Sequence, residues 1–82
     1  MVYVYILKSI KIPEKYYIGH SENIVKRLNR HNLGLVRSTK FARPWKVIYR
    51  KKFISKADAY KREMKIKSFK GGNAFKKLIS IE

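Results

Sequence analysis

Two stretches, Tyr3-Val4-Tyr5-Ile6-Leu7 and Tyr16-Tyr17-Ile18-Gly19-His20, organise the rest of this chain. β-Branched and aromatic residues dominate both, which is typical of strands. We expect a strand over residues 2–7, a loop over 8–14 and a second strand over 15–18, ended by Gly19 and paired antiparallel with the first. The alternation gives the first strand two faces, with Val2, Val4 and Ile6 on one and Tyr3, Tyr5 and Leu7 on the other.

A basic helix is predicted to follow the second strand. Ser21 is a suitable N-terminal cap, and Glu22 in the first turn would oppose the positive end of the helix dipole. Ile24, Val25 and Leu28 recur at helical spacing. We expect the helix to end at about Asn32, because asparagine and the nearby Gly34 are residues at which helices stop.

The second half predicts one more strand and two more helices. A basic loop over residues 35–44 leads to a strand over 45–53, in which Trp45, Val47 and Tyr49 alternate with Lys46, Ile48 and Arg50. The stretch from Ser55 to Asp58 resembles a capping box and opens a helix through about Lys67. Gly71-Gly72 breaks the chain, and Asn73 is suited to cap a last helix.

The resulting order is β-β-α-β-α-α, which predicts an α+β fold. A small three-stranded antiparallel sheet flanked by helices would use all of the apolar pattern. We interpret residues 1–82 as a single domain, so any functional site must lie on the surface of its one core.

Charge is the strongest compositional signal. The chain has 21 Lys and Arg against five Asp and Glu, a formal net charge of +16. Such a body attracts polyanions, and neutralising phosphates releases counterions, so nucleic acid is the leading partner. A solvated basic surface, or a structural protein of a ribonucleoprotein, is the simpler alternative. The candidate nucleic-acid-binding residues are Lys26, Arg30, Arg37, Lys40 and Arg43.

The composition also excludes several kinds of site and anchor. The chain has no cysteine, so disulfides and cysteine-bound zinc are excluded. No apolar run is long enough to span a bilayer, and the chain opens on a strand pattern without a signal-peptide design. No separate basic amphipathic helix points to a membrane surface. We therefore expect a cytoplasmic protein that does not bind membranes.

Glu63 is the acidic residue that a cap, loop or chain end does not explain. It follows Ala59 by four residues and lies beside Met64, within the core-facing stripe of its helix. A carboxylate there is costly to bury unless it is paired or bound to a cation. A structural ion pair with a nearby lysine or arginine and a metal site are both open interpretations.

Arg27 and His31 are one helical turn apart and share a face beside Leu28. They could simply belong to a phosphate-binding surface. A more specific interpretation makes Arg27 a clamp on a scissile phosphate, because its planar fork suits phosphate oxygens. His31 would then accept a proton or orient another group.

Tyr5 and Tyr17 lie on the two predicted neighbouring strands. Tyrosines in strands are usually amphipathic packing residues. In a chain this cationic, however, we expect the pKa of a phenol to fall, because nearby cations favour phenolate. A tyrosine with a lowered pKa is a credible base for activating water.

The pattern resembles the GIY-YIG nuclease family. Its first motif is similar to Tyr3-Val4-Tyr5, with Tyr3 and Val4 where the family often has glycine and isoleucine, and its second motif matches Tyr17-Ile18-Gly19. The helix arginine falls at Arg27, the following histidine or tyrosine at His31, and the later glutamate at Glu63. The run from Tyr17 to Asn32, the Arg43-Pro44-Trp45 turn and the helix segment around Glu63 resemble the small stand-alone members of uncharacterised function (UPF0213-like).

This resemblance implies a metal-dependent DNA endonuclease that uses one divalent cation, Mg²⁺ or Mn²⁺. By position, Tyr5 or Tyr17 helps to activate water, Arg27 stabilises phosphate charge, His31 assists proton transfer and Glu63 holds the metal. One carboxylate is enough for magnesium, which keeps several waters. Asn73 falls near a polar position of some members, although a helix cap explains it equally well.

Two other functions compete with the nuclease. A non-catalytic nucleic-acid-binding module on the same fold would explain the charge, and so would a ribosome-associated structural protein, but neither needs an inward Glu63. Without a second domain for sequence recognition, we expect a structure-selective or weakly selective enzyme.

Overall fold

The computed structural model describes residues 1–80, so the last two residues of the predicted domain lie outside the described part. The strands and helices follow the predicted order, with one additional 3₁₀ turn, η1. They are β1 (Val2–Ser9), β2 (Tyr16–Ser21), α1 (Ile24–Asn32), η1 (Lys40–Ala42), β3 (Trp45–Phe53), α2 (Lys56–Ser68) and α3 (Asn73–Ser80). No helix within residues 1–80 is both long and apolar enough to cross a membrane.

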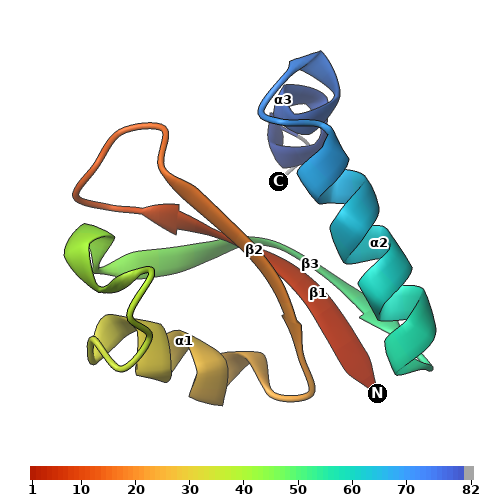
Figure 1. Cartoon of the computed structure of the whole chain (residues 1–82), viewed down its shortest axis with the longest axis horizontal. Helices are drawn as coiled ribbons and strands as arrows, with labels where there is room; N and C mark the ends of the chain where they lie inside the picture. Colours follow the sequence, from red (N-terminus) through yellow and green to blue (C-terminus); the bar gives the residue numbers. More distant parts are fainter. Residues whose placement is uncertain (81–82) are drawn as a thin grey trace.

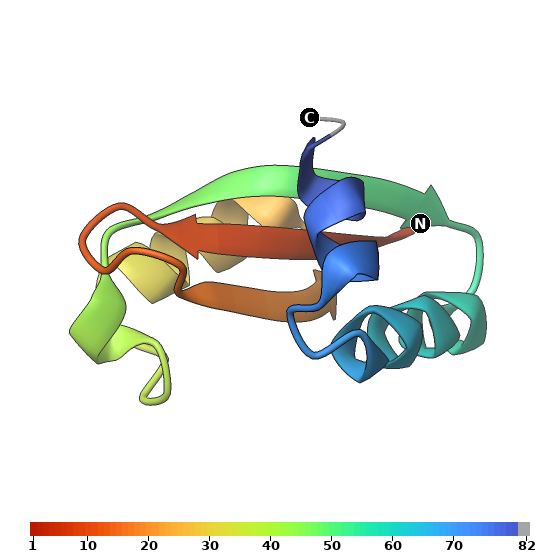
Figure 2. The ribbon, with the colours of Figure 1, turned by 90° about the horizontal axis from the view of Figure 1, so that it is seen from above.

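The predicted three-stranded antiparallel sheet is confirmed, with the strand order β2-β1-β3. Figure 2 shows β1 between its two neighbours. Helix α1 lies on one face of the sheet, and α2 and α3 lie on the other (Figure 1). The fold therefore has three layers, and β1 is covered on both faces.

Each face of β1 contributes to a different cluster of buried residues, which corrects the expectation of one core but follows the predicted alternation. Val2, Val4 and Ile6 pack with side chains of α2 and α3. Tyr5 and Leu7 pack with Ala42 and Trp45 on the α1 side. Four consecutive residues from Val4 to Leu7 have at most 1% of their surface exposed, which makes β1 the centre of the molecule.

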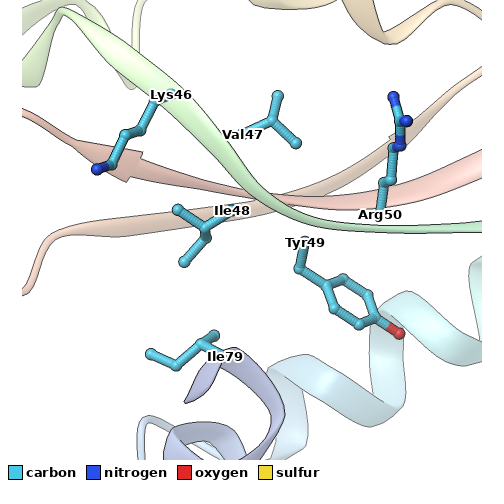
Figure 3. A pocket seen from close by; sticks show the side chains of 6 residues that line it. All are labelled: Lys46, Val47, Ile48, Tyr49, Arg50 and Ile79. Atoms are coloured by element: carbon cyan, nitrogen blue, oxygen red, sulfur yellow. The ribbon is translucent and has the colours of Figure 1, made fainter. Parts of the chain in front are cut away.

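A bulge in β3 changes the expected alternation of that strand. Leu7 pairs with Val47 while Ile6 pairs with Tyr49, so Ile48 is an extra residue. Val47 packs on the α1 side, whereas Ile48 and Tyr49 both pack on the side of α2 and α3. Figure 3 shows Val47 pointing to one side of β3 and Ile48 and Tyr49 pointing to the other, toward Ile79. The hollow that these residues line contains none of the predicted site residues.

The start of α1 differs from the prediction. Strand β2 continues through His20 and Ser21 because these residues pair with Val4 and Tyr3. The helix cap is consequently Asn23, whose side chain accepts from the Lys26 backbone N–H at 3.0 Å, and not Ser21. Glu22 precedes the cap and does not lie in the first helical turn.

The end of α1 confirms the predicted stop at Asn32. Gly34 has a φ of 78°, a left-handed conformation that favours glycine. Its N–H donates to His31 O at 3.2 Å, and the N–H of Leu35 donates to Arg30 O at 3.0 Å. These two bonds satisfy carbonyl groups at the helix end and turn the chain toward η1.

Of the predicted caps of the last two helices, Ser55 is confirmed and Asn73 is wrong. Ser55 caps α2 by accepting from the Asp58 backbone N–H at 3.2 Å, as predicted. Asn73 is the first residue of α3, and the Lys76 N–H donates to Gly72 O, so Gly72 occupies the predicted cap position of Asn73. Asn73 also lines a shallow hollow with other α3 residues.

Candidate active site

Tyr5 and Tyr17 come together over Gly19. Tyr5 pairs with Gly19 across β1 and β2, and the rings of Tyr5 and Tyr17 are 6.3 Å apart. A Cβ atom added to Gly19 would lie 2.9 Å from Tyr5 Oη and 3.0 Å from Tyr17 Cε2. The space above Gly19 is therefore filled by the two phenols, which explains why this position has no side chain.

Helix α1 places Arg27 and His31 against these rings, as their spacing predicts. The His31 ring centroid lies 4.7 Å from that of Tyr17 and 6.4 Å from that of Tyr5. The guanidinium of Arg27 interacts with both phenols. Four of the five predicted catalytic residues therefore form one cluster on the α1 face of the sheet.

His31 is completely buried and belongs to a chain of polar contacts. Its Nδ1 lies 2.7 Å from Thr39 Oγ1, and its Nε2 lies 3.5 Å from Tyr5 Oη. Thr39 Oγ1 in turn donates to Val36 O at 3.3 Å. With that hydroxyl proton committed, we assign the His31 proton to Nδ1, which leaves Nε2 to accept from Tyr5.

Electrostatics keep His31 neutral. Burial lowers the pKa of His31, and the positive charges of Arg27 and Arg30 lower it further. A neutral imidazole with no exposed surface can accept a hydrogen bond from Tyr5. The predicted role of His31 in proton transfer stays a prediction.

Burial raises the pKa of Tyr5 to about 12, which corrects the expectation of a lowered value. The interaction with Arg27 acts in the opposite direction but is smaller. Only 1% of the Tyr5 surface is exposed, and phenolate is poorly solvated there. Tyr5 is therefore protonated at neutral pH in this structure and can donate a hydrogen bond. Its predicted role in activating water stays a prediction.

Arg27 has a donor that the protein leaves free. Interaction with the Tyr5 hydroxyl raises the pKa of Arg27, although burial opposes this, so the guanidinium keeps its charge. Within residues 1–80, its Nε is buried and has no hydrogen-bond acceptor. Leaving a buried donor unsatisfied is unfavourable. The Nε of Arg62 is in the same state, so this feature alone does not mark a phosphate site.

Glu63 points inward from α2, as predicted, and is 6% exposed. One carboxylate oxygen contacts Nδ1 of His20, and the other lies 2.7 Å from Nζ of Lys67. Burial raises the pKa of Glu63, but the bonds from His20 and Lys67 outweigh it, so the net pKa is lowered. The ion-pair interpretation of Glu63 is thus correct for this structure.

Glu63 and the phenol cluster lie on opposite faces of the sheet. His20 pairs with Val4 and faces α2, whereas the adjacent Gly19 pairs with Tyr5 and faces α1. Because β2 is an edge strand, the two groups flank one strand, between α1 and α2 in Figure 1. The charge of Glu63 contributes to the raised pKa of Tyr5, so the groups interact through space.

Glu63 supplies the type of ligand, a carboxylate, that a hard cation such as Mg²⁺ binds. Its carboxylate already holds one positive group, the Lys67 ammonium, whose side chain is 47% exposed and has a path to solvent. Within residues 1–80, no group of three or more His, Cys, Asp or Glu residues forms a metal site. A Mg²⁺ ion at Glu63 would therefore have one carboxylate ligand there, and its other ligands would be water or substrate oxygen.

The predicted nucleic-acid-binding residues divide into two sets. Arg37, Lys40 and Arg43 line one hollow together. Lys26 and Arg30 are exposed on α1. All five are exposed, and three of them lie on the segment that also contains Thr39. Their binding to nucleic acid stays a prediction.

Sequence reasoning missed His20 and Thr39. His20 directly follows the Tyr17-Ile18-Gly19 motif, and strand alternation would have placed it toward α2 if β2 had been extended past Gly19. Thr39 lies in an irregular segment, and its contact with His31 joins residues eight positions apart. No periodicity in the sequence signals that contact.

Comparison with known proteins gives one family. The model of the GIY-YIG catalytic domain matches residues 1–76. A UPF0213 protein of Staphylococcus saprophyticus is 38% identical over 68 residues, which cover 82% of this chain and 80% of that protein. A UPF0213 protein of Oceanobacillus iheyensis is 37% identical, with 98% and 88% covered. No solved structure matches the chain.

Proposed function

Because this chain belongs to the GIY-YIG catalytic domain family, we propose that it is an endonuclease that hydrolyses DNA phosphodiester bonds with one divalent cation, Mg²⁺ or Mn²⁺. The family is of nuclease type, so nucleic acid is the substrate class. The observation that best supports hydrolysis is the charged guanidinium of Arg27 beside the two phenols. A planar guanidinium suits the oxygens of a scissile phosphate.

Arg27 has the main electrostatic role in this proposal. Negative charge develops on the phosphate oxygens in the transition state, and a fixed guanidinium stabilises it without reorganising. Tyr5 donates a hydrogen bond to His31 and braces the guanidinium, while the less buried Tyr17 orients the attacking water. His31 and Thr39 are positioning residues, because their contacts lead from the buried end of Tyr5 away from the site.

Glu63 holds the cation when DNA is bound. The cation would supply Lewis-acid stabilisation of the phosphate charge. Lys67 must then release its carboxylate oxygen, and its half-exposed stem gives the ammonium a route to solvent or to a neighbouring phosphate. This exchange explains how a carboxylate that is paired with Lys67 in the free protein can bind a cation in the DNA complex. It implies that the free protein binds the metal weakly.

Weak or structure-based selectivity is part of the proposal. The available cations contact phosphates, which carry no sequence information. Their binding should weaken steeply with salt, because it depends on counterion release.

A non-catalytic nucleic-acid-binding module is the second candidate. It is favoured by one observation, namely that both carboxylate oxygens of Glu63 are already paired, one with His20 and one with Lys67. If that pairing persists in the complex, the fold binds DNA without a metal.

A cleavage assay separates the two candidates. Branched, flapped and linear DNA are incubated with Mg²⁺ or Mn²⁺ and the parent protein, Glu63→Ala or Arg27→Ala, and binding is measured in EDTA. Glu22→Gln, which alters an exposed carboxylate, is the matched control. A nuclease requires cleavage by the parent and the control, with both site variants binding but not cutting. Equal background cleavage by all four proteins would support the binding module.

A further inference from the structure

A hollow on the segment between α1 and β3 combines an exposed aromatic ring with several cations. Phe41, in η1, is 54% exposed. The hollow that it lines also contains the side chains of Lys11, Arg37, Lys40 and Arg43. A further cation, Lys15, has its Nζ 5.3 Å from the centre of the Phe41 ring.

These cations come from two separate segments of the chain. Lys11 and Lys15 belong to the loop between β1 and β2, whereas Arg37, Lys40 and Arg43 belong to the segment between α1 and β3 that contains η1. Figure 1 shows the two segments side by side at the same end of the sheet. Converging charges of one sign repel each other, so their assembly around an apolar ring is not explained by stability.

The backbone that carries Phe41 is held firmly on both sides. Ser9 Oγ donates to Ala42 O at 2.6 Å, and the Ile10 N–H donates to Pro44 O at 2.9 Å. Trp45 Nε1 donates to Thr39 O at 3.0 Å. The neighbours of Phe41 are thus anchored in the core while its own ring is presented outward.

We propose that Phe41 is a base-stacking platform for an unpaired stretch of DNA, with the surrounding cations binding the phosphates of that strand. A phenyl ring gains little from a duplex, whose base faces are already covered by their neighbours. An unpaired base exposes its flat face, and stacking it on an aromatic ring beside phosphate-binding cations is the common mode of single-strand recognition. Such stacking is tolerant of sequence.

This platform deepens the proposed nuclease function, and its nucleic-acid partner rests on that function. Thr39 contacts His31 in the phenol cluster and lies two residues before Phe41. A strand stacked on Phe41 is therefore held by the same anchored segment that braces the site. The substrate class that follows is DNA with an unpaired arm next to the bond that is cut, such as a flap or a branch.

Binding to a fluorescent twelve-nucleotide oligothymidylate and to a twelve-base-pair duplex tests the platform, with EDTA present to prevent cleavage. We expect Phe41→Leu to weaken oligothymidylate binding by about 5- to 100-fold, the usual cost of losing one stacked base. Duplex binding should stay within about twofold, because phosphate contacts do not depend on the ring. Phe41→Trp should restore single-strand binding.

Tyr60→Leu is the matched control, because Tyr60 is an aromatic residue of similar exposure, 53%, on α2. It should leave the preference for single strands unchanged. Circular dichroism and the fluorescence of the buried Trp45 report whether each variant keeps the fold. Equal weakening of both ligands in folded Phe41→Leu, no weakening, or failure of tryptophan to restore binding would overturn the proposal.

The outcome is independent of cleavage. A protein that loses single-strand binding through Phe41→Leu but never cuts DNA would refute the nuclease and leave the platform standing. A protein that cuts flapped DNA while Phe41→Leu binds oligothymidylate normally would refute the platform alone.

Discussion

Replacing Gly19 by alanine tests the packing of the candidate site at its tightest point. The added Cβ would lie 2.9 Å from Tyr5 Oη, 3.0 Å from Tyr17 Cε2 and 3.1 Å from Tyr5 Cζ. Real Cβ atoms essentially never show the 2.9 Å separation, and the other two are tighter than most Cβ contacts, so the Tyr5 ring must move. Tyr5 is 1% exposed and its ring packs edge-on near the His31 ring, so it has little space to move.

The sign of the stability change is diagnostic. Without a clash, alanine in a strand is more stable than glycine by roughly 0.5–1 kcal/mol. Overpacking a tight site costs about 1–3 kcal/mol. We therefore expect Gly19→Ala to destabilise the fold by about 1 kcal/mol net, which lowers the melting temperature of a domain of this size by about 4–8 °C.

A double-mutant cycle with Tyr5→Phe identifies the cause, using thermal melts of the parent, both single variants and the double variant. Removing the Tyr5 hydroxyl eliminates the shortest contact, so Gly19→Ala should cost less in that background. If Gly19→Ala stabilises the parent, or costs the same in both backgrounds, the reasoning is wrong.

Three further predictions follow from the same cluster. Arg27→Lys should lower the cleavage rate by about 10²–10³, the usual loss for one transition-state donor, with little change in DNA binding; equal losses in Arg30→Lys would contradict this. Thr39→Val should destabilise the fold by about 1–3 kcal/mol in urea melts, because His31 Nδ1 loses its partner, whereas Thr39→Ser should not; equal costs would refute the bond. Burial and the charges of Arg27 and Arg30 lower the pKa of His31 in the folded protein. In the unfolded chain this histidine has its usual pKa of about 6.5, so below that pH the unfolded chain binds more protons than the folded protein. The stability that neutral His31 contributes is present above that pH and is lost as the pH falls toward the folded pKa. His31→Gln should flatten this acid-side slope in urea midpoints at about pH 7.5 and 5.5, and an unchanged slope would contradict burial of the imidazole.

Local pattern was sufficient to predict most of the fold. Alternation in β1 separated Val4 from Tyr5, and both faces are buried as the apolar residues on each side suggest. Pairing across strands was less accessible, because the extension of β2 to Ser21 depends on its partner Tyr3 in β1. The bulge at Ile48 likewise arises from the register of two strands, which no property of β3 alone encodes.

The candidate site was predicted in part for the same reason. Helical spacing correctly brought Arg27 and His31 together on one face. The pKa of Tyr5 was predicted in the wrong direction because net charge is visible in a sequence, whereas the burial that dominates is not. The inward orientation of Glu63 was predicted correctly. Its position on the opposite face of the sheet from the phenols was not, because it depends on how β2 lies between the two helices.

Whether the Glu63 carboxylate exchanges Lys67 for a metal ion is the central question, and anomalous diffraction from a crystal of the complex with a short flapped DNA and Mn²⁺ answers it directly. The account predicts one manganese peak at the Glu63 carboxylate, with the Lys67 ammonium released and Arg27 contacting a phosphate. A complex in which DNA is bound, the Glu63–Lys67 pair is intact and no manganese peak is present at Glu63 would contradict it.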